Sequence, residues 1–230
     1  MTYPTILFSI GLAFAGIAAA LGGAFWILLW PAASFWAVVI LGYAGKRPGL
    51  VGKRMDGTIA PLSYLFFLPF LLFSQTSWGL FRLFVREDAC NEIVPGLWIG
   101  RWPGEHDLPK GVDLVVDVTA ELPVRRRVVH AGRAYLCLPA LDASVPDPEV
   151  FRETVERLAA DSRGLFVHCA FGHGRSAMVV AALLIRRGLV RDLEEAEALL
   201  KAKRPLVSMS ARQRSYVRLV ESPRTASAAE

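Results

Sequence analysis

The most informative stretch of the chain is LFVHCAFGHGRSAMVVAALLI at residues 165–185. Residues 165–168 suit a short buried strand, and the apolar run at 177–185 suits a buried helix. Between them lies a short loop with two glycines, which leads directly into the helix. Such a loop directs backbone N–H groups toward one point, and the helix dipole adds positive potential there. The stretch therefore predicts a strand, an anion-binding loop and a helix.

Two residues of this loop, Cys169 and Arg175, point to a particular chemistry. A cysteine at the positive mouth of the loop is stabilised as a thiolate, which is the nucleophilic form. The planar guanidinium of Arg175 suits two oxygens of a phosphoryl group and holds them in the transition state. Ser176 is placed to donate a hydrogen bond to the sulfur and help it leave. His168, on the strand side of the cysteine, is expected to order the loop from behind.

The pattern H-C-x-x-G-x-x-R-S at residues 168–176 resembles the signature of the cysteine-dependent tyrosine phosphatase superfamily, in its compact dual-specificity branch. The other interpretations are a structural buried cysteine, a rhodanese-like loop and a metal site. A rhodanese-type loop lacks this Gly and Arg-Ser arrangement, and too few Cys or His residues lie nearby for a metal site. The resemblance implies a cysteinyl-phosphate intermediate and no metal or cofactor. The residues expected to bind the substrate phosphate are Ala170, Phe171, Gly172, His173, Gly174 and Arg175.

The resemblance also implies an upstream aspartate that protonates the leaving oxygen, because an alkoxide or phenolate leaves poorly. Two aspartates in the segment 138–148, Asp142 and Asp147, are candidates. Asp142 follows a predicted strand and a proline, as the acid does in the family, whereas Asp147 suits a helix cap. We therefore expect Asp142 to be the general acid, with Asp147 as the alternative. The same residue would later take a proton from the attacking water.

The first 84 residues differ from the rest of the chain in charge. Residues 5–45 carry no charged side chain, and residues 1–84 hold 5 of the 26 Lys and Arg but 1 of the 21 Asp and Glu. Most of the net charge of +5 therefore lies in this part. This distribution favours contact with anionic lipids and does not favour nucleic acid as a partner. A further basic run, Arg125-Arg126-Arg127, is interpreted as a solvated loop, with a lipid-surface patch as the alternative.

The uncharged run is about twice as long as one membrane-spanning helix requires. It predicts a hairpin of two helices that turns near Gly22 and Gly23. A basic loop follows at 45–57, which the positive-inside rule places in the cytoplasm, and then a third apolar stretch at 59–80. If this stretch spans the membrane, the loop and the catalytic domain lie on opposite sides. Two explanations are open: the stretch is re-entrant or interfacial, or the basic loop lies outside the cell. The sequence therefore predicts either two or three membrane spans.

Three segments are expected in the chain: a membrane anchor at 1–84, a phosphatase domain at 85–221 and a disordered tail at 222–230. The three cysteines are scattered and odd in number, so they predict no disulfide framework. A nucleophilic cysteine must stay reduced, which favours the cytoplasm. We therefore expect an integral membrane protein with its catalytic domain on the cytoplasmic side.

Strands that alternate with helices predict an α/β fold, with a mostly parallel central sheet flanked by helices on both faces. An all-α membrane segment and a polar linker at 85–92 precede it. The expected strands are 97–100, 114–118, 134–138 and 165–168, and the expected helices are 148–160, 175–187, 192–203 and 209–220. The fold implied by the dual-specificity resemblance is the same.

The function predicted from these features is that of a membrane-anchored phosphomonoester hydrolase. Its first expected substrates are phosphotyrosine, phosphoserine or phosphothreonine proteins, and its other expected partners are membrane lipids. The alternative is a phospholipid head-group phosphatase acting on phosphatidylglycerophosphate or a phosphoinositide. A different class, a non-catalytic phosphate-binding membrane scaffold, would be favoured if Cys169, Arg175 or the acid were missing. A transporter is disfavoured because the apolar helices contain no charge that would mark an ion path.

Overall fold

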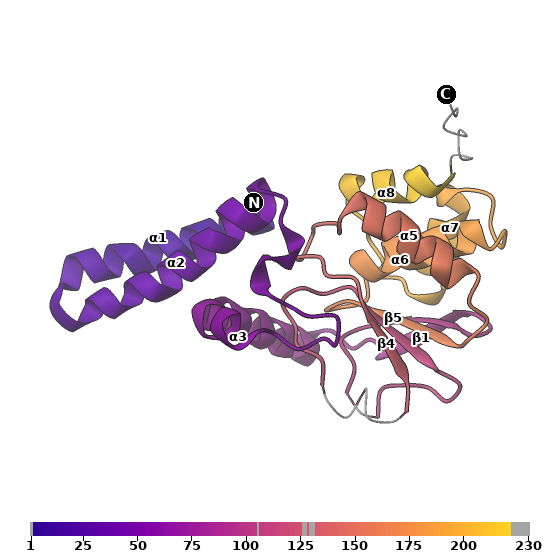
Figure 1. Cartoon of the computed structure of the whole chain (residues 1–230), viewed down its shortest axis with the longest axis horizontal. Coiled ribbons are helices and arrows are strands. Elements are labelled where there is room, and N and C mark those ends of the chain that lie inside the picture. Colours follow the sequence, from indigo (N-terminus) through magenta and orange to yellow (C-terminus); the bar gives the residue numbers. More distant parts are fainter. Residues whose placement is uncertain (1, 105, 126–127, 129–131, 222–230) are drawn as a thin grey trace.

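The computed structural model of this 230-residue chain describes residues 2–104, 106–125, 128 and 132–221. The predicted tail at 222–230 and two members of the basic run, Arg126 and Arg127, lie outside the described residues. Figure 1 shows two parts, an N-terminal group of helices and an α/β domain, which are in contact with one another.

Within the described residues, the α/β domain is built on a five-stranded sheet with the order β1-β2-β5-β3-β4. Strand β1 is antiparallel to β2, and the other neighbours are parallel. The mostly parallel sheet predicted from the sequence is thereby confirmed. The strands are β1 (Cys90–Val94), β2 (Leu97–Gly100), β3 (Leu114–Asp117), β4 (Ala134–Cys137) and β5 (Leu165–His168).

The register of the parallel strands brings their carboxyl ends to one edge of the sheet. His168, the last residue of β5, lies opposite Gly100 on β2 and Asp117 on β3. In open parallel sheets, ligands bind beyond this edge. The loop after His168 therefore starts at the centre of the sheet, between two neighbouring strand ends.

Four helices lie together on one face of the sheet (Figure 1). They are α5 (Pro148–Ala159), α6 (Arg175–Arg186), α7 (Leu193–Lys203) and α8 (Ala211–Glu221). Their apolar sides share one buried cluster with alternate strand residues such as Val116 and Val167. The residues between these, Val115 and Phe166, point to the opposite face and pack with Val112. These four helices therefore cover one face of the sheet, whereas the sequence predicts helices on both faces.

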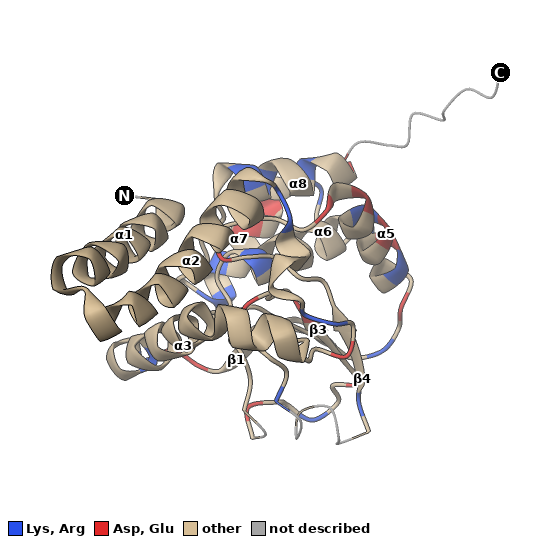
Figure 2. Ribbon diagram, turned by 60° about the vertical axis from the view of Figure 1, so that its left-hand side comes forward, with Lys and Arg blue, Asp and Glu red and all other residues tan. Residues whose placement is uncertain are grey.

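The N-terminal part begins with an antiparallel hairpin that extends away from the α/β domain (Figure 1). Its elements are α1 (Tyr3–Leu21), the 3₁₀ helix η1 (Gly23–Leu28), α2 (Leu29–Ala37) and the π-helical η2 (Val38–Ala44). The predicted turn is present, because Gly22 and Gly23 have φ values of +60° and +55° that favour glycine. Charged side chains are absent from the described part of the hairpin (Figure 2).

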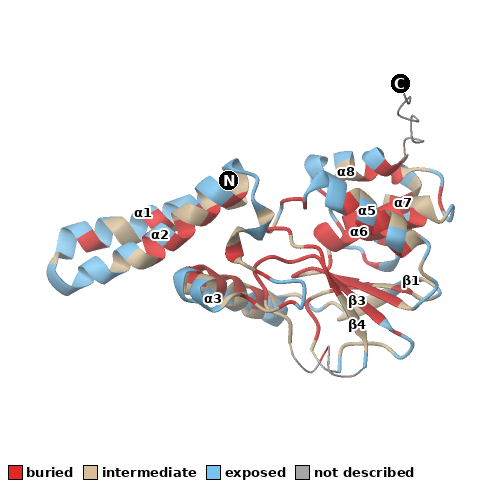
Figure 3. Ribbon diagram, in the orientation of Figure 1, coloured by how far each residue is buried: buried red, intermediate tan, exposed pale blue. Residues whose placement is uncertain are grey.

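The short helix η3 (Pro48–Val51) and a tight turn connect the hairpin to α3 (Pro61–Phe84). Helix α3 packs against α2 through Phe70 and Phe73, whose rings contact Phe35. Within the described residues, three helices are long and apolar enough to cross a membrane: Tyr3–Leu21, Gly23–Ala44 and Pro61–Phe84. Many of their outward side chains are exposed (Figure 3).

Candidate active site

The signature loop, residues 169–174, joins β5 to α6 and places Cys169 below the first turn of that helix. The Cys169 sulfur is 3.3 Å from the backbone N of Gly172 and 3.4 Å from the Ser176 hydroxyl. Gly172 has a φ of +81°, and a Cβ there would lie 2.6 Å from the backbone of Gly100. Only glycine fits this close approach of the loop to strand β2.

The surroundings of Cys169 favour the thiolate. Burial of the side chain raises its pKa, but the Arg175 charge and hydrogen bonds from Ser176 and the Gly172 N–H together hold the pKa below its ordinary value. The sequence predicts a lowered pKa from the helix dipole, the loop N–H groups and Arg175, but it does not predict the opposing effect of burial. Cys169 lines the cavity above it, where a thiolate has the nucleophilic form required for covalent chemistry.

Arg175 is buried and held by a set of oxygen acceptors. Its guanidinium lies 2.8 Å from the Glu121 carboxylate and 3.0 Å from Oδ1 of Asp142, and it donates to the Ala140 carbonyl at 2.7 Å. Its Nε is buried and has no hydrogen-bond partner among the described residues. Burial lowers the pKa of Arg175, but the two carboxylates raise it well above its ordinary value, so the group keeps its charge. One N–H edge therefore remains available for an oxyanion.

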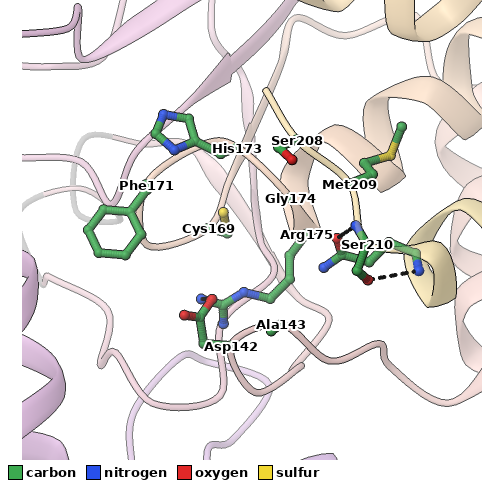
Figure 4. Close-up of a pocket in the computed structure, with 11 residues that line it drawn as sticks. Asp142, Ala143, Cys169, Phe171, His173, Gly174, Arg175, Ser208, Met209 and Ser210 are labelled. Carbon is green, nitrogen blue, oxygen red and sulfur yellow. Dashed lines mark hydrogen bonds and ion pairs between the residues drawn. The ribbon is translucent and has the colours of Figure 1, made fainter. Parts of the chain in front are cut away.

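The two candidate acids have different environments. Asp142 lines the same cavity as Cys169, and its side chain pairs with Arg175 (Figure 4). Asp147 instead caps helix α5, since its Oδ1 accepts hydrogen bonds from the backbone N of Glu149 and Val150. Asp142 is therefore the aspartate that the fold brings into the cavity with Cys169, and its role as the general acid stays a prediction.

The cavity above Cys169 has a volume of about 300 Å³. One wall is formed by Phe171 and His173 of the signature loop, and Figure 4 shows both side chains on the side away from Arg175. The opposite wall comes from a segment for which the sequence predicts no role in the site: Ser208, Met209, Ser210 and Gln213. No motif marks this segment, because it reaches the site through the packing of α8 on α6.

His168 lies behind the loop, as expected from its place on the strand. Its Nδ1 is 3.3 Å from the Cys169 carbonyl oxygen, and its Nε2 is 3.7 Å from Oδ2 of Asp117. The same Asp117 oxygen accepts from Nζ of Lys53 at 2.7 Å and from the Tyr135 hydroxyl at 2.7 Å. Burial raises the pKa of Asp117, but Lys53 and its other partners lower it to about 2. Burial lowers the pKa of His168.

Arg204 holds the outer side of the loop, although it is 35 residues from Cys169 in sequence. It donates to the carbonyl oxygens of Phe171 at 2.9 Å and Gly172 at 3.1 Å. It also pairs with Glu87 at 2.7 Å, and Glu87 contacts His173 at 2.7 Å. Neither Arg204 nor Glu87 was predicted, because an isolated charge in a helix end or linker carries no sequence signal.

Helix α3 also contacts the signature loop. Nε1 of Trp78 donates to the Ala170 carbonyl at 2.9 Å, and the ring of Phe81 is 4.4 Å from that of Phe171. The apolar N-terminal part therefore touches the loop that contains Cys169. The sequence contains no sign of this contact, because the apolar stretch at 59–80 predicts only part of a membrane anchor.

Most of the α/β domain is similar to known proteins. A family model described as "Dual specificity phosphatase, catalytic domain" matches residues 105–222. A variant of human DUSP28 is similar in structure, with a TM-score of 0.51 and 24% identity, over 59% of this chain and 95% of that chain. Tk-PTP in its active form has a TM-score of 0.51 and 25% identity, over 59% of this chain and 98% of that chain.

PTPMT1 in complex with PI(5)P has a TM-score of 0.51 and 22% identity, over 58% of this chain and 95% of that chain. At this identity the likeness shows the fold. Residues 1–104, which include the three apolar helices, lie outside the range matched by the family model.

Proposed function

The chain belongs to the dual-specificity phosphatase family and is a cysteine-dependent phosphatase, and on this basis we propose that it is a membrane-held phosphomonoester hydrolase with Cys169 as its nucleophile. The supporting observation is the position of the Cys169 sulfur. It lies at the base of an open cavity, next to the first turn of α6 and to Arg175. This is the arrangement required for attack on a bound phosphoryl group.

In the first half-reaction, the Cys169 thiolate attacks phosphorus, so that an S–P bond forms while the bond to the leaving oxygen breaks. The residues 170–174 and Arg175 bind the non-bridging oxygens, and the free Nε edge of Arg175 supports this role. Protonated Asp142, at the mouth of the cavity, gives its proton to the leaving oxygen.

In the second half-reaction, water attacks the phosphocysteine. Asp142 takes a proton from this water while the S–P bond breaks, and inorganic phosphate is released. The hydroxyl of Ser176, 3.4 Å from the sulfur, donates to the departing thiolate. Arg175 carries positive charge in both steps, which stabilises the charge that builds up on the phosphoryl oxygens. His168 orders the loop from behind without contacting the substrate.

The apolar helices hold this enzyme in a membrane, and its catalytic domain lies on the cytoplasmic side. The length and hydropathy of the hairpin support the first statement. Two observations support the second. Among the described residues the three cysteines are all free, and the basic residues Lys46 and Arg47 follow directly after the hairpin. Residues 1–84 form the anchor and 85–221 the catalytic domain.

Phosphorylated protein side chains are the first substrate class, since the cavity opens to solvent and carries the general signature of the family. A phospholipid head group is the second candidate. It is favoured by the contact between Phe171 in the signature loop and Phe81 in apolar helix α3. The ratio of kcat/KM on a phosphotyrosine peptide to kcat/KM on phosphatidylglycerophosphate, both in the same mixed micelles, separates the two classes.

The nucleophile is tested by Cys169→Ser in the full chain in detergent. We expect turnover of an aryl phosphate to fall by at least about 10⁴-fold while inorganic phosphate still binds, because the loop and Arg175 remain. In the wild type, the lowered pKa of Cys169 should keep activity high well below pH 9.0, the ordinary pKa of the thiol.

Cys90→Ser is the matched control, because Cys90 lies in β1 and does not line the cavity. This variant should turn over the aryl phosphate like the wild type. Unchanged turnover in Cys169→Ser would remove the assigned nucleophile. Phosphate binding without turnover in the wild type would instead favour a non-catalytic scaffold.

A further inference from the structure

The turn that precedes helix α3 and the C-terminal end of the helix both contact the α/β domain. Four residues before the helix begins, the carbonyl of Gly57 accepts a hydrogen bond from the backbone N of Val124 at 2.9 Å. At the other end, Trp78 and Phe81 contact the signature loop. Phe67, Phe70 and Leu71 in the middle of the helix share one buried cluster with Ala120 and Leu141 of that domain.

These contacts are incompatible with a helix that crosses a bilayer. Helix α3 has 24 residues, which corresponds to a length of about 36 Å, enough to span a hydrocarbon core of about 30 Å. The two ends of a spanning helix face water on opposite sides of the membrane. The α/β domain, which contains most of the charged residues of the chain, would then have to pass through the hydrocarbon core to touch both ends.

The side chains of α3 divide into two faces. One face is buried against the hairpin and the domain, and consists of Phe67, Phe70, Leu71, Ser74 and Trp78. The helical period places a second set of apolar residues on the opposite face, and these residues are exposed. They include Leu62, Leu65, Phe66, Leu72, Leu80 and Leu83. The relative exposures of Leu62, Leu72 and Leu83 are 84%, 52% and 76%, so this face is uncovered from end to end.

Basic residues lie near both ends of α3 along the chain. Arg54 precedes the helix, and Arg82 and Arg86 lie at its end. The Arg82 guanidinium is exposed and lies 4.8 Å from the centre of the ring of Trp78, which belongs to the buried face. Arginine and tryptophan at a helix end are typical of the water–lipid interface. An apolar stripe with cations near both ends complements anionic head groups above an acyl layer.

We propose that α3 lies in the plane of the bilayer surface, with its exposed face in the lipid, while the hairpin α1–α2 crosses the hydrocarbon core. The partner is the lipid bilayer itself. In Figure 1, α3 is seen nearly end-on beside the sheet while the hairpin runs across the page, so the two directions differ strongly. Both termini of the hairpin are at the domain end, where the rings of Tyr3 and Tyr43 are 6.3 Å apart.

This arrangement resolves the conflict found in the sequence. With α3 in the plane, the basic loop and the catalytic domain are on the same side of the membrane, and the number of spans is two. The same placement of α3 brings the signature loop close to the lipid surface, because Trp78 and Phe81 of α3 contact this loop. The inference rests on the membrane attachment proposed above and is independent of the phosphatase chemistry.

The depth of spin labels tests this placement. In a full chain with Cys90→Ala, Cys137→Ala and Cys169→Ser, single cysteines are introduced on the exposed face as Leu62→Cys, Leu72→Cys and Leu83→Cys. Each variant is labelled with a nitroxide in vesicles of phosphatidylethanolamine and phosphatidylglycerol, and its depth is measured by power saturation. Leu12→Cys in the middle of α1 is the control for a deep position. Leu189→Cys, which is 51% exposed on the α/β domain, is the control for water.

We expect the three α3 labels to lie at one shallow depth, clearly above the Leu12 label. A label at Leu72 that is as deep as the one at Leu12, with shallow labels at Leu62 and Leu83, would show a spanning helix and overturn the proposal. Labels on both α1 and α3 that are as accessible to water as the Leu189 label would instead refute membrane attachment. Leu65→Cys and Leu80→Cys, on the same face, replace any variant that fails to fold.

Discussion

Asp142 and Asp147 lie five residues apart, yet they make different hydrogen bonds, and this difference separates their roles. Asp142→Asn removes the proposed proton donor, and we expect kcat to fall by about 10²–10⁴-fold on an alkyl phosphate. The fall should be smaller for an activated aryl ester, whose oxygen leaves without a proton. The measurement is kcat for a series of leaving groups at fixed pH.

The control for this prediction is Asp147→Ala. It removes the hydrogen bonds to Glu149 and Val150 at the start of α5, which costs about 1 kcal/mol of stability. Its kcat should not depend on the leaving group more steeply than that of the wild type. If Asp147→Ala instead shows the steep dependence and Asp142→Asn does not, the general acid is Asp147.

Individual residues could be assigned from the sequence only where their neighbours in the chain fix their position. Cys169 and Arg175 lie close together because the short loop that contains Cys169 leads directly into the helix that begins at Arg175. Glu121 and Arg204 are distant in sequence and reach the site through tertiary packing. An isolated Glu or Arg carries no pattern that distinguishes it from a solvated side chain, so neither was predicted.

At the level of elements, apolar runs identified the buried strands and helices, with ends that differ by one or two residues. The sequence predicts a polar linker at 85–92, but strand β1 (Cys90–Val94) begins inside this range. It is an edge strand that pairs on one side with β2, and its sequence Cys-Asn-Glu-Ile-Val alternates weakly. Its placement depends on the antiparallel pairing with β2, which single-sequence patterns do not encode.

The charge of the connection between α2 and α3 predicts a basic membrane-flanking loop, but one of its lysines, Lys53, is buried. Nζ of Lys53 donates to Asp117 at 2.7 Å and to the carbonyl and hydroxyl oxygens of Thr119 at 2.8 and 2.9 Å. All three of its protons are thereby used. The ammonium group fixes Asp117, which faces His168 behind the signature loop.

Lys53→Met should therefore destabilise the protein by about 3–5 kcal/mol, because it leaves the Asp117 charge buried without its main partner. The stabilisation by Asp117 is present above its ordinary pKa of 3.8 and is lost as the pH falls toward 2, so the comparison is made at neutral pH. Denaturant unfolding in detergent measures the loss.

Arg54→Met, which changes the exposed neighbour in the same turn, is the matched control and should unfold like the wild type. The double variant Lys53→Met/Asp117→Asn removes both charges and should recover a large part of the stability. Equal stability of Lys53→Met and Arg54→Met would contradict the assigned role of the ion pair.

For the whole molecule, the predicted boundary between an anchor and a catalytic domain matches the distribution of charged residues, but many side-chain contacts cross it. The charge pattern separates residues 1–84 clearly from the rest (Figure 2). However, the Tyr43 hydroxyl donates to the Asp142 carbonyl at 2.8 Å, Lys53 pairs with Asp117, and Trp78 holds Ala170. Composition predicted that an apolar part exists, but it contains no information on which side chains of that part face the domain.

These contacts predict how truncated chains behave on a soluble aryl phosphate in detergent, where membrane attachment is irrelevant. Residues 45–230 keep Lys53 and Trp78 but lose Tyr43, whereas residues 85–230 lose all three. We expect kcat/KM to fall in the order full chain, 45–230, 85–230. The last should be at least about tenfold below the full chain, because small displacements of catalytic groups are costly. If residues 85–230 fold and match the full chain in kcat/KM, the apolar part is only a tether.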